Sequence, residues 1–427
     1  MKKVALSLAS VLAAATFAQE ASAVPAFARQ TGMACTACHA QHFPILNGFG
    51  RAFKAAGFTM MGAQEKVEGE HLSIPANLNF GLLLKARYQK TDGTNKDKTN
   101  DLGDKVSGSS TSSGQWQIPD EYSMFWGGRV ADTGMIKIGS MTEFDAAGGG
   151  TLGLRVPVVV DMDAVKLSVI PYATDALGPF YGYSESSTGV TRGVRWAEHR
   201  KEISAHQYTG MGAGVASGIA FVAHHEMGYI NISRFSRNLF YTAGTNGTNM
   251  GNTAITLAVT PTIADWAIVA GVQSLSGQSN VYTAGADMSV DAANTVAGVT
   301  PVDTAADTYA MTKETATGVD LQAHGAIVGM ETGLYFSNAS LGDGSKVKAT
   351  TFGADVTVVP HTLSLGAAYR AGTNGTGKSD NAVTLTAVYD LVQNVALHAN
   401  YSMYSGDAYS AAGSAKSLFT GMLEAAW

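Results

Sequence analysis

The chain has 427 residues, of which 45% are hydrophobic and only 15% charged, and its formal net charge is −6 at pH 7. This composition excludes an intrinsically disordered chain, which needs low hydrophobicity and high charge. Two cysteines exclude a small disulfide-stapled protein, and the acidic balance argues against nucleic acid as a partner.

The first 23 residues have the pattern of a secretory signal peptide. Lys2 and Lys3 precede a mostly apolar run over 4–18, and residues 21–23 read Ala-Ser-Ala, an A-x-A cleavage signal. The apolar run is too short to cross a membrane as a helix. We therefore expect residues 1–23 to be removed and the mature protein to be exported.

From residue 76 onwards, apolar and polar residues alternate with a period of two. The alternation is clear over 78–88 and 319–327, and it is cleanest over 363–369, 383–389 and 395–401. This period is typical of β-strands with one apolar and one polar face. No mature segment has 18 or more consecutive apolar residues, so helical membrane spans are not expected.

Short and long connections alternate between these strands. We predict short turns near 131–134, 161–163, 210–214, 261–263, 328–330, 360–361 and 391–394. Longer loops are predicted near 91–115, 146–151, 174–194, 236–252, 277–314, 339–347, 371–380 and 405–416, and 215–234 is interpreted as one long strand. About sixteen strands result, as in outer-membrane barrels with short periplasmic turns and longer outside loops. The last residues, 419–427 with a terminal Trp427, resemble the closing strand of Gram-negative outer-membrane proteins. The fold class is thus all-β, a transmembrane barrel over 76–427 in contact with outer-membrane lipid.

A segment of different character, residues 24–75, precedes the first strand. It contains the only two cysteines, in the run Cys35-Thr36-Ala37-Cys38-His39, and C-x-x-C-H is the attachment signature of c-type haem. The two thiols bind the two vinyl groups of one haem, and the adjacent His39 is placed to bind its iron. A disulfide or a thioredoxin-like redox pair is the alternative, but the βαβ context of thioredoxins is missing and His39 would have no role. We predict one covalent haem c, held by Cys35, Cys38 and His39.

A short helix is expected after this motif, beginning at Pro44 and ending at Gly57. Its apolar face is formed by Ile45, Phe49, Ala52, Phe53 and Ala56. Arg51 and Lys54 lie off that face and are candidates to meet the haem propionates, with a solvated basic edge as the alternative. A segment of this size has little core of its own, so we expect it to plug the barrel lumen or to dock at its periplasmic mouth.

The second axial ligand of the iron is expected from the same segment. The candidates are Met33, His42, Met60, Met61 and His71. We predict Met60, because a Met/His pair raises the potential of c-type cytochromes and Met60 follows the helix closely enough to fold back. His42 is too near His39 to reach the opposite haem face. Ordinary packing is the alternative for both Met60 and Met61.

The N-terminal residues carry a resemblance to a known family. The run AVPAFARQTG over 23–32, the motif at 35–39 and the residues Phe43-Pro44, Phe49-Gly50-Arg51 and Phe53-Lys54 resemble the fused monohaem cytochrome–porin family. These proteins are outer-membrane iron oxidases of iron-oxidising bacteria. The specific match covers about 23–62, and the barrel is similar in architecture only. The resemblance implies that the haem oxidises extracellular Fe(II) and that a periplasmic c-type cytochrome accepts the electron. A passive porin carrying a haem and an outward electron conduit are the alternatives.

Two groups of side chains are candidates for binding Fe(II). Acidic loop residues would supply hard oxygen ligands, and they are Asp92, Asp97, Asp101, Asp104, Asp120 and Glu121. Solvated loop charge is the preferred interpretation, because lysines are interleaved with these acids. His224, His225 and Glu226 also resemble a metal cluster, but neighbours on a strand point to opposite faces, so we expect no shared metal there.

Overall fold

The computed structural model describes residues 25–40, 44–62, 64–93, 111–147, 151–239, 249–283 and 308–427. The expected signal peptide over 1–23 lies outside the described residues, as do His42, Asp97, Asp101 and Asp104. Among the helices that are described, none has the length and apolarity needed to cross a membrane.

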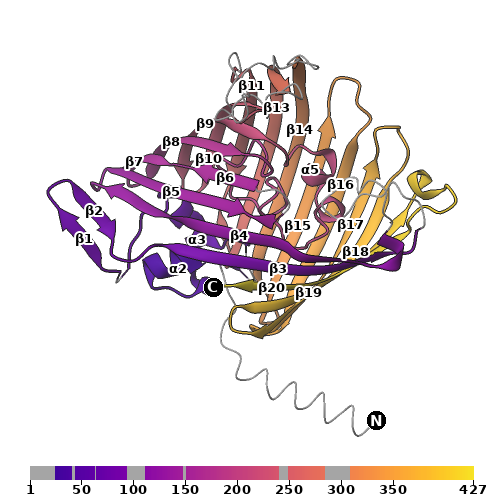
Figure 1. Cartoon of the computed structure of the whole chain (residues 1–427), viewed down its shortest axis with the longest axis horizontal. Helices are drawn as coiled ribbons and strands as arrows, with labels where there is room; N and C mark the ends of the chain where they lie inside the picture. The colour runs from indigo at the N-terminus through magenta and orange to yellow at the C-terminus, as the bar shows by residue number, and fades with distance from the viewer. Residues whose placement is uncertain are drawn as a thin grey trace, which may run out of the picture.

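Most of the chain forms one closed antiparallel barrel (Figure 1). Its first strands are β3 (Phe80–Thr91), β4 (Gln115–Asp132), β5 (Ile136–Asp145), β6 (Thr151–Arg155), β7 (Val158–Met162), β8 (Val165–Thr174), β9 (Ala216–His225), β10 (Gly228–Ser236), β11 (Asn252–Val259) and β12 (Thr262–Ile263). The others are β13 (Trp266–Thr283), β14 (Thr308–Ile327), β15 (Met330–Leu341), β16 (Lys348–Val359), β17 (Leu363–Thr373), β18 (Asn381–Val392), β19 (Val395–Ser405) and β20 (Ser417–Ala426). Pairing of β20 with β3 closes the barrel.

Two of these strands are interrupted. Both β6 and β7 pair with β5 on one side and β8 on the other. The break falls at Val156 and Pro157, where proline cannot donate a ladder hydrogen bond. Likewise β11 and β12 both pair with β13. The described strands therefore make a sixteen-stranded barrel, which confirms the predicted fold class.

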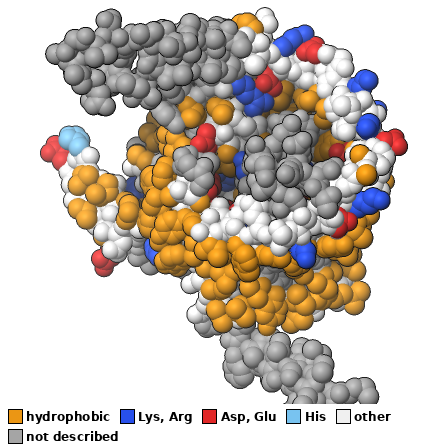
Figure 2. All heavy atoms as spheres, turned by 45° about the vertical axis from the view of Figure 1, so that its right-hand side comes forward, with side chains coloured by type: hydrophobic (Ala, Val, Ile, Leu, Met, Phe, Trp, Pro, Cys, Tyr) orange, Lys and Arg blue, Asp and Glu red, His pale blue; other side chains and the backbone are white. Residues whose placement is uncertain are grey.

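The barrel is apolar outside and polar inside. Leu385 and Leu397 are 48% and 39% exposed on the outer face, whereas Thr384 and Asn400, which point inward, are buried. Apolar side chains cover a broad part of the outer surface in Figure 2. An apolar outer face around a polar interior is the arrangement of a transmembrane barrel.

Six of the seven predicted short turns are confirmed, and the turn at 210–214 is wrong. The expected long strand over 215–234 is two strands, β9 and β10, joined at Glu226 and Met227. Residues 175–215 leave the barrel wall and contain α4 (Arg200–Ile203) and α5 (Ala205–Thr209). The predicted number of about sixteen strands is nevertheless correct. The strand missed within 215–234 is offset by a strand that was wrongly predicted just before residue 210. We call residues 175–215 the inward segment.

The N-terminal residues contain α2 (Pro25–Thr31), the 3-10 helix η1 (Cys35–Ala37) and α3 (Gly48–Ala55). We call residues 25–62 the plug, and α2 lies against β3 and β4. The strands β1 (Lys66–Gly69) and β2 (Leu72–Pro75) form a separate two-stranded sheet. This hairpin projects beyond the end of the barrel at the left of Figure 1, and the sequence did not predict it.

The helix α3 begins later than predicted. Asn47 is its N-cap, since its side-chain oxygen accepts a hydrogen bond from the backbone of Gly50 at 2.9 Å. Ile45 therefore precedes the helix, where it is fully buried, while Phe49 is 40% exposed. Ala52 is also exposed, so the predicted apolar face is wrong in these three positions. The predicted end is confirmed, because Gly57 has φ +71° and follows the last turn.

Candidate functional site

Glycines of the barrel wall make room for the plug. A Cβ atom on Gly128 of β4 would lie 1.8 Å from the side-chain oxygen of Gln30, and one on Gly139 of β5 would lie 1.7 Å from the carbonyl oxygen of Gly57. Gln30 is buried and donates hydrogen bonds to the carbonyls of Phe58 and Met60, both at 2.7 Å. The plug is thus fitted directly against the inner wall of the barrel.

The C-x-x-C-H motif is held in one compact turn. The backbone N–H groups of Cys38 and His39 both donate to the carbonyl of Cys35, and Cys35 and Cys38 do not form a disulfide. Helix α3 packs closely on this turn, because a Cβ on Gly50 would lie 2.1 Å from the carbonyl oxygen of Cys38. The same carbonyl accepts a hydrogen bond from the backbone of Asn47.

The His39 ring is oriented by the backbone. Its Nδ1 lies 3.2 Å from the carbonyl oxygen of Ile45, and a carbonyl can only accept, so the proton is on Nδ1. The lone pair available to a metal is then on Nε2. Hydrogen bonding of one ring nitrogen to a carbonyl is the usual way in which a metal-binding histidine is positioned.

A cavity lies in front of the motif. Its walls come from the plug, from strands β3 to β6 and from the inward segment. The space not filled by protein atoms, including its opening to solvent, is ≈ 1630 Å³. Cys35, Cys38 and His39 line it together, with apolar side chains from Phe53, Phe58, Leu83 and Phe125. The structure therefore brings the three predicted haem residues to one partly apolar cavity, a lining whose thiols, imidazole and apolar walls fit a covalently bound haem.

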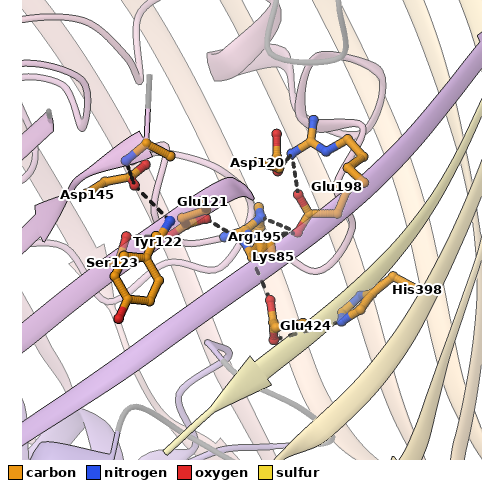
Figure 3. A network of polar contacts seen from close by, with 12 residues as sticks. Lys85, Asp120, Glu121, Tyr122, Ser123, Asp145, Arg195, Glu198, His398 and Glu424 are labelled. Atoms are coloured by element: carbon orange, nitrogen blue, oxygen red, sulfur yellow. Dashed lines mark hydrogen bonds and ion pairs between the residues drawn. The ribbon is translucent and has the colours of Figure 1, made fainter. Parts of the chain in front are cut away.

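Charged side chains of the barrel wall and the inward segment meet beside this cavity (Figure 3). Lys85 lies 2.8 Å from Glu121, 3.5 Å from Glu424 and 3.6 Å from Glu198. Arg195 donates to one carboxylate oxygen of Glu198 from two nitrogens, at 3.0 and 2.6 Å. Burial alone would raise the pKa of Glu198, but Arg195 and Lys85 hold that pKa well below its usual range. Each charged side chain of this network thus has at least one oppositely charged neighbour.

The two acids Asp120 and Glu121 are not loop residues, contrary to the expectation from sequence. They belong to β4 and line the cavity, where Asp120 pairs with Arg87 and Glu121 with Lys85. Neighbouring strand residues normally face opposite sides. Both acids reach the cavity because the β3–β4 register shifts between Lys85 and Arg87.

The inward segment crosses the lumen of the barrel. The two ring nitrogens of His199 lie 2.6 Å from Ser402 on β19 and 2.8 Å from Thr420 on β20. The backbone N–H of Ala205 donates to Ser337 on β15 at 2.9 Å. This segment leaves the wall after β8 and returns at β9, so these bonds tie it to the opposite wall. Sequence analysis missed this feature, although the cluster of Arg and His over 192–206 is a poor match to a lipid-facing strand.

Arg51 and Lys54 are both buried, so the predicted alternative of a solvated basic edge is wrong. The Nζ of Lys54 donates to the carbonyl of Ser184 and lies 5.5 Å from the ring centre of Tyr183. Burial, with the nearby Arg155 charge, holds the pKa of Lys54 well below its usual value. Arg51 lies 3.7 Å from Glu185. Of the two, Lys54 lines the cavity and Arg51 does not.

Met60 does not line the cavity with His39. It lies with Met61 and Arg129 at a second depression, and Arg129 contacts the sulfur of Met61 at 3.3 Å. The thioethers that line the main cavity are Met33 and Met141. His71 is at the exposed turn between β1 and β2. The assignment of Met60 as the second iron ligand stays a prediction that this placement does not favour.

Of the residues considered for Fe(II), those that the structure describes are not arranged around a common metal site. Asp92 accepts hydrogen bonds from the backbone of Lys416 and Ser417, at 2.8 and 2.9 Å. His224 lies 3.0 Å from Glu185, while His225 accepts from the backbone of Met227 at the turn. Across the ranges that the structure describes, no group of three or more His, Cys, Asp or Glu side chains is arranged to hold a metal ion.

The known proteins to which this chain is similar are found among solved structures. No protein-family model matches the sequence, and no curated protein matches it significantly. Among solved structures, in-vitro folded OmpT of Vibrio cholerae is similar over 85% of this chain and 100% of its own, with 13% identity and a TM-score of 0.46. A double mutant of Rhodopseudomonas blastica porin is similar over 82% and 100%, with 9% identity and a TM-score of 0.48. Both TM-scores are below 0.5, so the assignment of the fold rests on the closed barrel described above.

Proposed function

We propose that the protein is an outer-membrane cytochrome–porin of a Gram-negative bacterium. It oxidises extracellular Fe(II) and passes the electron to a periplasmic c-type cytochrome. The observation that carries the proposal is the shared cavity, in which Cys35, Cys38 and His39 meet inside a transmembrane barrel. The family resemblance of residues 23–62 supplies the direction of electron flow and the choice of iron.

The plug residues have separate roles in holding the haem. Cys35 and Cys38 would hold the haem by adding their thiols across its two vinyl double bonds, with sulfur bonding to one carbon and hydrogen to the other, so that no atom is lost. His39 would bind the iron through Nε2, with its Nδ1 fixed by the carbonyl of Ile45. When bound, the haem supplies a one-electron centre that alternates between ferric and ferrous iron.

The barrel and the inward segment limit access to this site. The apolar band of such a barrel is ~25 Å tall, so an electron centre has to lie within the lumen to serve both sides. The plug and the inward segment occupy the lumen around the motif. This filling favours electron transfer over the passive porin alternative, which requires a lumen that conducts solutes.

Anaerobic reduction of the purified full-length protein by Fe(II) tests the proposal. We expect ferrous iron to reduce the haem rapidly and nearly stoichiometrically, as followed by the reduced-minus-oxidised spectrum. The Cys35→Ala/Cys38→Ala variant serves as the control and should show no haem spectrum. A wild-type haem that stays oxidised in excess Fe(II) would refute the iron-oxidase function and support the outward conduit.

A further inference from the structure

The walls of the main cavity carry more positive than negative charge. Its six cationic side chains are Lys54, Arg87, Arg155, Arg192, Arg195 and Arg200. Its four carboxylates are Asp120, Glu121, Glu143 and Asp145. Among the described lining residues, cationic side chains therefore outnumber carboxylates by two, although Glu198, which does not line the cavity, pairs with Arg195. Because buried charges are costly unless they are paired, the cations without a close carboxylate partner are candidates to bind an anionic ligand.

Local contacts account for only some of these cations. Arg87 pairs with Asp120, and Arg195 with Glu198. Arg200 is buried, yet it reaches Glu198 only at 3.9 Å and its Nε has no hydrogen-bond partner. Arg192 is half-buried; within the part of the chain that is described it makes no hydrogen bond, and its charge acts on the carboxylate of Asp175.

The two remaining cations are already engaged. The guanidinium of Arg155 donates to the carbonyl of Tyr181 at 3.1 Å and lies 4.7 Å from the centre of that ring. Lys54 donates to the carbonyl of Ser184. Arg192 and Arg200 are therefore the cavity cations whose donors are least used.

The charge of Arg200 is repelled by the charges of both Arg192 and Arg195. Burial, followed by the positive charges of Arg195 and Arg192, lowers the pKa of Arg200 to about 9. Glu198 and Glu121 offset this only in part. A carboxylate placed between the guanidinium groups would relieve the repulsion, and arginine is the residue best suited to bind carboxylates in a bidentate way.

We propose that Arg192 and Arg200 of the inward segment bind the two propionate carboxylates of the haem. This inference rests on the proposed function, because it requires the covalent haem. It replaces the expectation that Arg51 and Lys54 meet the propionates. The haem is then held by the plug through Cys35 and Cys38 and by the inward segment through its carboxylates.

The pairing has a measurable consequence for the reduction potential. Propionates paired with arginine stay ionised, so the potential changes little with pH. Without its arginine a buried propionate has a raised pKa, and the extra positive charge of ferric haem lowers that pKa relative to the ferrous state. Reduction then takes up a proton, and the potential falls as pH rises. The fall reaches about 59 mV for each tenfold change in proton activity when one proton accompanies one electron.

Redox titrations of the full-length haem protein over about pH 5–8 test the inference. The variants are Arg192→Gln and Arg200→Gln, with Arg192→Lys as the conservative change. Arg129→Gln is the matched control, since Arg129 also faces the plug but lies at the second depression. We expect a potential that falls with pH in both glutamine variants and a flat potential in the wild type, in Arg192→Lys and in Arg129→Gln.

A flat potential in both glutamine variants would overturn the inference while leaving haem attachment and Fe(II) oxidation intact. A slope in Arg129→Gln as steep as in Arg192→Gln would also overturn it, because the effect would then be unspecific. Should Arg200→Gln fail to assemble, Arg192→Gln decides alone, since Arg192 is half-buried. Wild-type protein without covalent haem would refute both this inference and the proposed function.

Discussion

Replacing Gly50 by alanine should loosen the turn formed by the C-x-x-C-H motif, and replacing Gly48 should not. Both glycines are in α3, and alanine at either position improves helix propensity by up to ~1 kcal/mol. At Gly48 the nearest atom to an added Cβ is a side-chain nitrogen of Arg51, 4.0 Å away. At Gly50 the added atom would lie 2.1 Å from the carbonyl oxygen of Cys38, which belongs to the backbone.

The size of the effect follows from these contacts. Overpacking a close contact costs ~1–3 kcal/mol. Moving the Cys38 carbonyl also weakens its hydrogen bond from Asn47, which contributes about 0.5–1.5 kcal/mol. After the gain in helix propensity, Gly50→Ala should destabilise plug docking by about 2 kcal/mol, a factor of about 30 in the equilibrium constant. Gly48→Ala should be neutral or stabilising.

Urea titration of the haem circular dichroism in the Soret region measures this docking. The barrel strands carry no haem, so the signal reports the plug. We expect the midpoint for Gly50→Ala to fall clearly below that of the wild type, and the midpoint for Gly48→Ala to equal or exceed it. Identical midpoints for the two variants would show that α3 does not pack closely on the C-x-x-C-H turn.

Three further predictions concern the haem, its ligands and the topology. The Cys35→Ala/Cys38→Ala variant should lack covalent haem on a denaturing gel, and haem that stays attached would refute the motif assignment; His39→Ala should lose the low-spin spectrum. Because Met141 lines the cavity and Met60 does not, Met141→Leu should alter the ferric haem spectrum more than Met60→Leu, and the reverse order would restore Met60 as the ligand. Tags inserted near residue 375 or 410 should be labelled on intact cells and tags near 361 or 392 should not, so equal labelling of both sets would contradict the strand orientation.

The strands could be predicted because lipid and lumen impose opposite requirements on neighbouring residues. Leu385 and Thr384 alternate in sequence as they do in the barrel, one exposed and one buried. The C-x-x-C-H spacing likewise indicated that Cys35, Cys38 and His39 lie together, because they belong to one turn and need no distant partner. Sequence patterns therefore predicted those features that depend only on residues close together in the chain.

The lumen could not be predicted in the same way. The inward segment has no single period, because its side chains bind several separated strands, as His199 does with Ser402 and Thr420. The pairing of Asp120 and Glu121 with Arg87 and Lys85 depends on a register shift that spacing does not reveal. Met60 follows α3 closely in sequence, yet the hydrogen bond from Gln30 to its carbonyl holds it at another depression.

Under the proposed function, the inward segment would keep iron ions away from the haem by filling the lumen. The segment crosses the lumen and is bound to distant strands, through His199 to Ser402 and Thr420 and through Ala205 to Ser337. Its arginines would not repel iron by charge, because Arg195 pairs with Glu198 and the propionates would pair with Arg192 and Arg200. Electrons would not be excluded by this filling, since they tunnel through packed protein. The haem could thus accept an electron from outside while ferric iron, poorly soluble near neutral pH, forms outside the barrel.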